Sequence, residues 1–298
     1  MTVGELGEFG LIARGVARLQ APPPPAGPGD DAAVVPAPDG RVVATTDLLV
    51  EGRHFRRDWS SAYDVGVKAA AQNLADVAAM GAVPTALLVG LATPADLPLA
   101  VADGLTDGLR DEAARAGAVV VGGDVVRADT LTIAVTALGD LRGLGPVTRA
   151  GARVGDLVVL AGRIGWAAAG LALLERGQLE GQLQDAHRRP EPRYDAGPLL
   201  ASLGATAMVD TSDGLVQDLG HLATASGVRV ELSGAALRPD RGVTLPDVLH
   251  GGEDHALVAT VPAGSGTPFP VIGRVLAGEG VWLDGGRLRP AGWDHFRS

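Results

Sequence analysis

The chain has 298 residues, of which 46% are hydrophobic, 20% are charged and only 3% are aromatic. Its formal net charge of −10 opposes binding to nucleic acid, and the absence of cysteine excludes disulfides, thiolate metal sites and cysteine nucleophiles. No apolar run approaches the roughly 20 residues of a membrane span and the start lacks a signal-peptide profile, so we expect a cytoplasmic protein without a membrane partner.

Hydrophobic periodicity and turn residues predict the elements of the first half in chain order. They are helices over 6–14, 62–80 and 96–116 and strands over 32–36, 41–46, 85–92, 118–121 and 130–138. Pro38-Asp39-Gly40 between the first two strands indicates a hairpin. The helix over 62–80 has Ser60 or Ser61 as its N-cap and Gly81 after its last turn.

A Gly- and Pro-rich segment over 142–155 separates this half from the next. The second half is predicted to contain strands over 157–161, 206–209, 228–232, 256–261, 270–275 and 280–283, and helices over 165–176, 194–203 and 214–225. The pattern indicates an α+β fold of two mixed α/β halves, with domains over 1–145 and 146–298.

Five acidic motifs lie at small-residue corners beside apolar runs. They are Gly-Asp-Asp-Ala-Ala at 29–33, Thr-Thr-Asp at 45–47, Asn-Leu-Ala-Asp at 73–76, Gly-Gly-Asp at 122–124 and Asp-Thr-Ser-Asp-Gly-Leu at 210–215. If these corners converge, cations must lie between the carboxylates, and Mg²⁺ suits oxygen-rich cages that substrate phosphates complete. The only lysine, Lys68, follows Val67, which excludes a Walker A loop.

Each acidic residue also has a purely structural interpretation. Aspartate commonly caps turns, and Asp213 or Ser212 can be the N-cap of the helix that follows. Asp76 is less easily explained, because the helix dipole disfavours a negative charge late in a helix. Two acids three residues apart at the end of a strand, Asp210 and Asp213, fit the edge where α/β sheets bind ligands. Five such corners together favour a shared metal–phosphate site.

The order of the motifs resembles that of thiamine-monophosphate kinases, within the superfamily of aminoimidazole-ribonucleotide synthetase and selenophosphate synthetase. The resemblance spans nearly the whole chain. Besides the acidic motifs, it rests on Leu-Gly-Glu-Phe-Gly-Leu-Ile at 6–12, Glu-Gly-Arg-His-Phe at 51–55, Arg-Ala-Gly-Ala at 149–152, Gly-Glu-Asp at 252–254, Ile-Gly-Arg-Val at 272–275 and Gly-Trp-Asp-His-Phe at 292–296.

The resemblance implies that ATP phosphorylates thiamine monophosphate to thiamine diphosphate, and that two N-terminal sheets join in a homodimer. By motif, Mg²⁺ would be bound by Asp30, Thr45, Thr46, Asp47, Asp76, Asp124, Asp210 and Asp213. Of these, Asp210 and Asp213 would also be catalytic. ATP would contact Gly123, Arg149 and Ser212, and thiamine monophosphate would contact His54, Glu253 and Trp293. In isolation, the sequence around Arg149 favours a solvated linker residue, and an aromatic residue such as Trp293 is more often a packing anchor than a stacking platform.

The attacking phosphate oxygen is already ionised, so we expect direct in-line transfer without a general base. Three departures from the family pattern affect nucleotide selectivity. Val125-Val126 replace two threonines, His255-Ala256 replace Tyr-Glu, and the helix over 96–116 has no aromatic residue. The alternatives are another ATP-using enzyme of the superfamily, such as aminoimidazole-ribonucleotide synthetase, or an acidic metal-binding module without catalytic activity.

Overall fold

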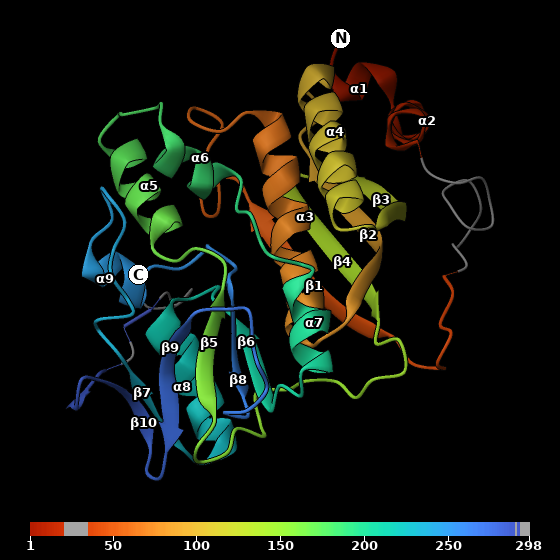
Figure 1. Cartoon of the computed structure of the whole chain (residues 1–298). Coiled ribbons are helices and arrows are strands. Elements are labelled where there is room, and N and C mark those ends of the chain that lie inside the picture. Colours follow the sequence, from red (N-terminus) through yellow and green to blue (C-terminus); the bar gives the residue numbers. More distant parts are fainter. Residues whose placement is uncertain (21–34, 290, 293–298) are drawn as a thin grey trace. The chain divides into compact units, whose positions relative to one another are not determined.

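The computed structural model describes residues 1–20, 35–289 and 291–292 (Figure 1). The chain divides into two compact units, Met1–Val77 with Pro84–Asp140, and Ala78–Val83 with Leu141–Ser298. Each unit combines helices with its own sheet, which confirms the predicted α+β class. The domain limits at residue 145, and the division of roles between the domains, stay predictions.

The first unit is built on a four-stranded sheet with the order β1-β4-β2-β3. Strand β1 pairs antiparallel with β4, and β2 pairs parallel with β3. In chain order the elements are α1 (Val3–Leu6), α2 (Glu8–Leu19), β1 (Val43–Val50), α3 (Ala62–Ala79), β2 (Val83–Thr93), α4 (Leu99–Arg115), β3 (Val119–Arg127) and β4 (Thr132–Asp140).

Two glycines allow α3 and α4 to cross in close contact. A Cβ atom at Gly66 would lie 2.2 Å from the carbonyl oxygen of Leu105, and one at Gly108 would lie 2.2 Å from that of Tyr63. Any side chain at either glycine would therefore force the helices apart. The start of α3 is fixed by Ser61, whose hydroxyl accepts the backbone N–H of Asp64, as the sequence predicted.

One face of this sheet exposes apolar side chains. Leu48 of β1, Leu88 of β2 and Val126 of β3 are 52%, 37% and 51% exposed. Strand pairing places them on the same face, since Leu48 pairs with Ala134 and a Cβ at Gly90 would touch the Ala134 side chain. Large apolar residues that share a face of an uncovered sheet mark a surface suited to association.

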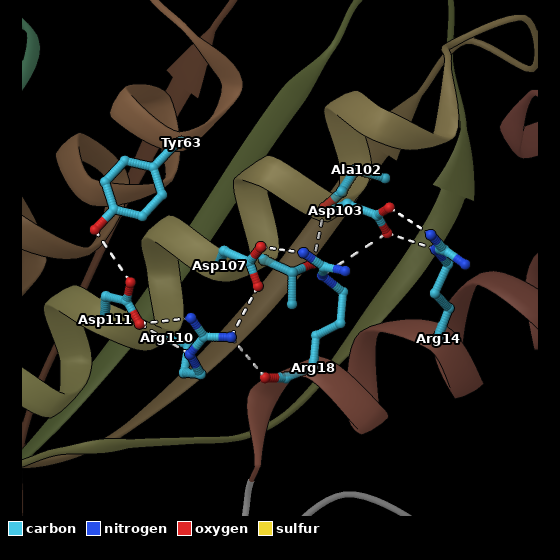
Figure 2. A network of polar contacts seen from close by, with 9 residues as sticks. Arg14, Arg18, Tyr63, Ala102, Asp103, Asp107, Arg110 and Asp111 are labelled. Carbon is cyan, nitrogen blue, oxygen red and sulfur yellow. Dashed lines mark hydrogen bonds and ion pairs between the residues drawn. The ribbon is translucent and has the colours of Figure 1, made fainter.

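Helix α2 is joined to α4 by alternating charges (Figure 2). The pairs are Arg14 with Asp103, Arg18 with Asp103 and Asp107, Arg110 with Asp107 and Asp111, and Tyr63 with Asp111. The hydrogen bond from Arg14 holds the pKa of Asp103 below its ordinary value. A network of this kind fixes α2 by charge as well as by packing.

The second unit is built on a seven-stranded sheet with the order β11-β10-β7-β9-β5-β8-β6. Its apolar core includes buried residues of α8 and of the central strands. The elements are β5 (Leu157–Ala161), α5 (Trp166–Glu175), α6 (Gln182–Arg188), α7 (Ala196–Ser202), β6 (Ala207–Asp210), α8 (Leu215–Ser226), β7 (Arg229–Leu232), α9 (Leu245–His250), β8 (Leu257–Val261), β9 (Val271–Leu276), β10 (Gly280–Leu283) and β11 (Gly286–Arg287).

Three features differ from the predicted elements. Strand β1 begins at Val43 and pairs with β4, and residues 35–36 form no strand; the predicted hairpin across Pro38-Asp39-Gly40 stays a prediction, because 32–34 lie outside the described residues. The motif at 122–124 is not a corner, because β3 runs through it from Val119 to Arg127 in a parallel pair with β2. Helices α6 and α9 were not predicted, because each is too short to show helical periodicity.

Candidate functional site

In the first unit, Thr45 and Asp47 of β1 face helix α3. The Thr45 hydroxyl donates to Oδ2 of Asp76 at 2.8 Å, and the Asp47 backbone N–H donates to Oδ1 of Asn73, also at 2.8 Å. The hydroxyl of Thr45 thus compensates the charge of Asp76 near the C-terminal end of α3. This arrangement brings Thr45, Asp47 and Asp76 together at one edge of the sheet.

The side chain of Thr46 points to the opposite face of the same strand. Its hydroxyl donates to the carbonyl oxygen of Val135 at 3.0 Å and accepts from the hydroxyl of Thr136 at 3.2 Å. The strand alternation that aligns Thr45 with Asp47 therefore separates the Thr46 hydroxyl from them. Its predicted contact with Mg²⁺ stays a prediction.

His54 lies in the turn after β1. Its Nδ1 accepts the backbone N–H of Val50 at 3.0 Å, which leaves the ring proton on Nε2. Lys68, the only lysine, is 2% exposed and donates to the His54 carbonyl oxygen at 3.2 Å. The single lysine thus supports the backbone of a predicted substrate residue.

Asp124 lies on β3, at the opposite edge of the sheet from β1. Its Oδ1 accepts the backbone N–H of Val125 at 2.9 Å. Three strand spacings of about 4.8 Å separate β3 from β1, or about 14 Å, so the sheet does not bring Asp124 into contact with Asp47. Gly123 is required by packing, because a Cβ there would lie 1.9 Å from the carbonyl oxygen of Val89.

In the second unit, β6 ends at Asp210, and the turn that follows carries Ser212 and Asp213. Backbone hydrogen bonds continue the β6–β8 pairing beyond the strand ends and tie this turn to the segment over 252–256. The bonds are Thr211 N to Ala256 O at 2.8 Å, His255 N to Thr211 O at 3.2 Å and Glu253 N to Ser212 O at 2.8 Å. The predicted nucleotide residue Ser212 thus lies beside the predicted substrate residue Glu253.

Two buried side chains hold the same turn. Nδ1 of His255 lies 3.0 Å from Oδ2 of Asp210, and Oδ2 of Asp218 accepts the backbone N–H groups of Asp213 at 3.1 Å and Gly214 at 2.9 Å. Burial, with added repulsion from Asp210 and Asp213, raises the pKa of Asp218 to about 8. Asp218 is therefore a largely neutral acid when no cation is nearby.

The segment around Glu253 has an unusual backbone. Glu253 and His255 have backbone φ angles of +66° and +52°, which residues other than glycine rarely adopt. Between them, Asp254 accepts the backbone N–H groups of Gly165 at 2.5 Å and Ala167 at 2.8 Å, at the start of α5. Burial raises the pKa of Asp254 to about 6. Strained backbone that several contacts maintain is typical of functional sites.

Glu253 also meets helix α6. Its Oε2 lies 3.3 Å from Nδ1 of the buried His187, an electrostatic contact that does not meet hydrogen-bond geometry. Helix α6 can approach because a Cβ at Gly170 of α5 would lie 2.0 Å from the carbonyl oxygen of Leu183. His187 therefore belongs to the surroundings of the predicted substrate residue.

The backbone around Arg149 lies beside strand β6, since the Met208 N–H donates to the Thr148 carbonyl oxygen at 3.1 Å. The Ser226 hydroxyl, at the C-terminal end of α8, donates to the Arg149 carbonyl oxygen at 2.9 Å. Arg149 is therefore held beside β6, the strand that ends at Asp210, and beside the end of α8. Its predicted contact with ATP stays a prediction.

Two predicted site residues, Asp30 and Trp293, lie outside the described residues. The described Gly292 comes close to the turn, since a Cβ there would lie 2.3 Å from the carbonyl oxygen of Asp213. The roles of both residues stay predictions.

The oxygen donors that are present fit Mg²⁺, which commonly takes one or two carboxylates and completes its shell with substrate phosphates and water. Pairs such as Thr45 with Asp76, and Asp210 with Asp213, supply donors of this kind. Over residues 1–20, 35–289 and 291–292, no three His, Asp or Glu side chains gather into a complete cage. Over the same residues, no helix is long and apolar enough to cross a membrane.

Sequence reasoning missed four residues around the second unit's turn: His187, Asp218, Asp254 and His255. Of these four, only Asp218 could have been found from the local sequence. It lies four residues after Gly214, so its side chain can reach the N–H groups at the helix start. His187 lies on an unpredicted helix, and the contact of His255 with Asp210 joins positions 45 residues apart. Long-range contacts of this kind have no sequence signature.

Comparison with known proteins matches both halves of the chain to domain families. Residues 29–141 match the AIR synthase related protein, N-terminal domain, and residues 153–281 match its C-terminal domain. The predicted fold of two such halves is therefore confirmed.

Relatives match the chain over nearly its full length. A thiamine-monophosphate kinase from Mycobacterium tuberculosis is 48% identical, with 99% of this chain and 93% of the relative covered. The structure of AaThiL complexed with AMPPCP and TMP is 35% identical with a TM-score of 0.81, and 99% of each chain is covered. The crystal structure of thiamine-monophosphate kinase from Stenotrophomonas maltophilia K279a is 32% identical with a TM-score of 0.82, covering 93% and 96%. The chain belongs to the thiamine-monophosphate kinase family.

Proposed function

We propose that this protein transfers the γ-phosphoryl group of ATP to thiamine monophosphate, forming thiamine diphosphate and ADP. The observation that carries the proposal is the pairing of the turn over 210–213 with the segment over 252–256. It joins the residues assigned to metal and nucleotide with one assigned to substrate. A relative 35% identical to this chain, AaThiL, was solved with AMPPCP and TMP, which supports the same pair of ligands here.

The chain's own residues bind and orient the reactants. We assign Ser212 and Gly123 to ATP, along with Arg149, whose planar guanidinium matches phosphate oxygens. His54, Glu253 and Trp293 are assigned to thiamine monophosphate. Mg²⁺ would be held by Asp30, Thr45, Thr46, Asp47, Asp76, Asp124, Asp210 and Asp213, and when bound it would neutralise the charge of the phosphates.

The transfer needs no general base from the protein. The acceptor is a phosphate oxygen, which is already ionised at neutral pH, so alignment and charge neutralisation are the main tasks. The carboxylates of the two buried acids near the turn, Asp218 and Asp254, accept backbone N–H groups. Their role is therefore to fix the backbone rather than to act as a general base. This arrangement supports direct in-line transfer. A phosphorylated enzyme trapped by rapid quench with labelled ATP would contradict it.

We also propose that the protein is a homodimer in which two first-unit sheets associate. The exposed apolar face formed by Leu48, Leu88 and Val126 supports this arrangement, because such side chains gain stability when a second sheet covers them. Leu48→Glu should shift the protein to a monomer in sedimentation analysis. A monomeric wild-type protein would contradict the proposal.

The decisive assay incubates the protein with ATP, Mg²⁺ and thiamine monophosphate and detects thiamine diphosphate by chromatography. Product should form in proportion to enzyme and disappear when Mg²⁺ is chelated. Asp213→Asn should lower turnover by orders of magnitude without lowering the melting temperature. No product from wild-type protein, together with turnover of formylglycinamidine ribonucleotide, would favour aminoimidazole-ribonucleotide synthetase. Metal binding without ATP consumption would favour a non-catalytic module.

A further inference from the structure

We propose that His255 and Asp218 are positioning residues that hold the turn over 210–214 from two sides. In this arrangement the carboxylates of Asp210 and Asp213 stay oriented toward a bound cation. The inference rests on the proposed function, and it adds two residues that act through the assigned ligands rather than on the substrates.

The contact of His255 with Asp210 fixes one oxygen of a carboxylate. Nδ1 lies 3.0 Å from Oδ2, and both side chains are buried, at 7% and 5% exposed. The His255 backbone is itself fixed, because its N–H donates to Thr211 within the same turn. An imidazole that holds one carboxylate oxygen restricts the carboxylate's rotation and leaves the other oxygen for a ligand.

Asp218 fixes the backbone at the other end of the turn. A single oxygen, Oδ2, accepts two consecutive backbone N–H groups, those of Asp213 and Gly214. Gly214 packs closely against the chain at His250, since its φ is +121° and a Cβ there would lie 2.7 Å from the carbonyl oxygen of His250. The orientation of Asp213 therefore depends on Asp218.

A simple helix cap would not require this arrangement. The side chain of Asp218 is buried, and it lies near two further carboxylates, which makes its own charge costly. Serine or asparagine can accept a backbone N–H at a helix start without that cost. A buried acid at this position therefore lowers the stability of the protein but fixes the conformation of the turn, a combination that recurs at functional sites.

The test measures cation binding directly. Mn²⁺, which reports on the Mg²⁺ site, is titrated into the full-length protein together with AMPPCP, and free Mn²⁺ is followed by electron paramagnetic resonance. His255→Phe and Asp218→Leu remove the contacts and should weaken Mn²⁺ binding about 10–100-fold, the range for residues that orient metal ligands. His255→Asn and Asp218→Asn keep a donor or acceptor near the same position and should stay within a few-fold of wild type.

A buried carboxylate elsewhere in the same unit supplies the control. Asp156 is 5% exposed and accepts the backbone N–H of Arg153 and the hydroxyl of Thr206. Asp156→Asn should lower the melting temperature without changing Mn²⁺ affinity. Should Asp218→Leu fail to fold, Asp218→Ser replaces it, because its short hydroxyl cannot reach both N–H groups.

The outcomes separate this inference from the proposed function. If wild-type protein binds Mn²⁺ but forms no thiamine diphosphate, the proposed function fails while the positioning role is still tested by the variants. If wild-type protein forms product and His255→Phe and Asp218→Leu bind Mn²⁺ as tightly as it does, the positioning role is overturned. It is also overturned if Asp156→Asn weakens Mn²⁺ binding equally, or if wild-type protein binds no Mn²⁺.

Discussion

The raised pKa of Asp218 makes the stability of the metal-free protein depend on pH. In the folded state burial and two neighbouring carboxylates raise this pKa to about 8, whereas an unfolded aspartate titrates near 3.9. Between these values the folded protein binds a proton that the unfolded chain has lost. The contribution of Asp218 to stability is therefore fully present below about pH 4 and falls as pH rises toward about 8.

The size of this effect follows from the two pKa values. From about pH 5.5 to about pH 8.5, linkage predicts a loss of about 3 kcal/mol in the free energy of unfolding from this one group. In a unit of this size that loss lowers the melting temperature by about 6–12 °C. Asp218→Asn keeps an oxygen acceptor but cannot ionise, so the variant should lose this part of the pH dependence.

The assay is thermal or urea unfolding of both proteins in buffers with a chelator, at several pH values between those limits. Titrating groups that do not interact with Asp218 affect both proteins equally and cancel in the difference, so the difference reports Asp218 with its coupling to Asp210 and Asp213. The difference in stability between variant and wild type should grow with pH in favour of the variant. Parallel curves, with a constant difference at every pH, would refute the burial and repulsion assigned to Asp218.

Three further predictions concern packing, capping and charge. Gly123→Ala would bring a Cβ to 1.9 Å from a carbonyl oxygen of β2 and should destabilise the first unit by about 1–3 kcal/mol. The control variant Gly145→Ala, whose Cβ would have no atom within 4 Å, should have the melting temperature of wild type. Asp254→Ala removes the acceptor of two N–H groups at the start of α5 and should lower the free energy of unfolding, measured in urea, by about 2 kcal/mol. An unchanged unfolding midpoint would contradict the capping role of Asp254. Arg14→Met breaks the pair with Asp103 and should speed amide exchange over 8–19 at low salt, a difference that should vanish in about 1 M salt.

The order of elements could be predicted from the sequence because most of them are long enough to show periodicity. The helix over 62–80 was predicted within a residue of α3, and the strand over 157–161 coincides with β5. The errors arose where pairing decides the structure. β3 continues through Gly122-Gly123-Asp124 because β2 lies beside it. Two consecutive glycines usually indicate a turn, but here they allow the two strands to lie in close contact.

The site was predictable to the extent that its residues lie in motifs. The acids at 210 and 213 were found because a strand ends where they begin, and Asp76 was noticed because its charge is misplaced in a helix. The hydroxyl that compensates Asp76 comes from Thr45, 31 residues earlier, and could not be inferred from helix chemistry. Residues that support ligands through folding, rather than through local sequence, become visible only in three dimensions.

The carboxylates of this protein can be grouped by the partner that compensates their charge, and a carboxylate without such a partner indicates where a cation is needed. Asp103 and Asp107 are paired with arginines, while Asp218 and Asp254 are buried against backbone N–H groups. Asp213 belongs to neither group: within the described residues of its own unit no arginine pairs with it, and the one lysine of the chain lies in the other unit. Asp210 contacts His255, but its charge and that of Asp213 still repel Asp218, and burial together with this repulsion favours the protonated form of Asp218. A bound cation would relieve the same repulsion, so proton and cation should compete at this turn, and cation affinity should rise with pH over the range in which Asp218 titrates.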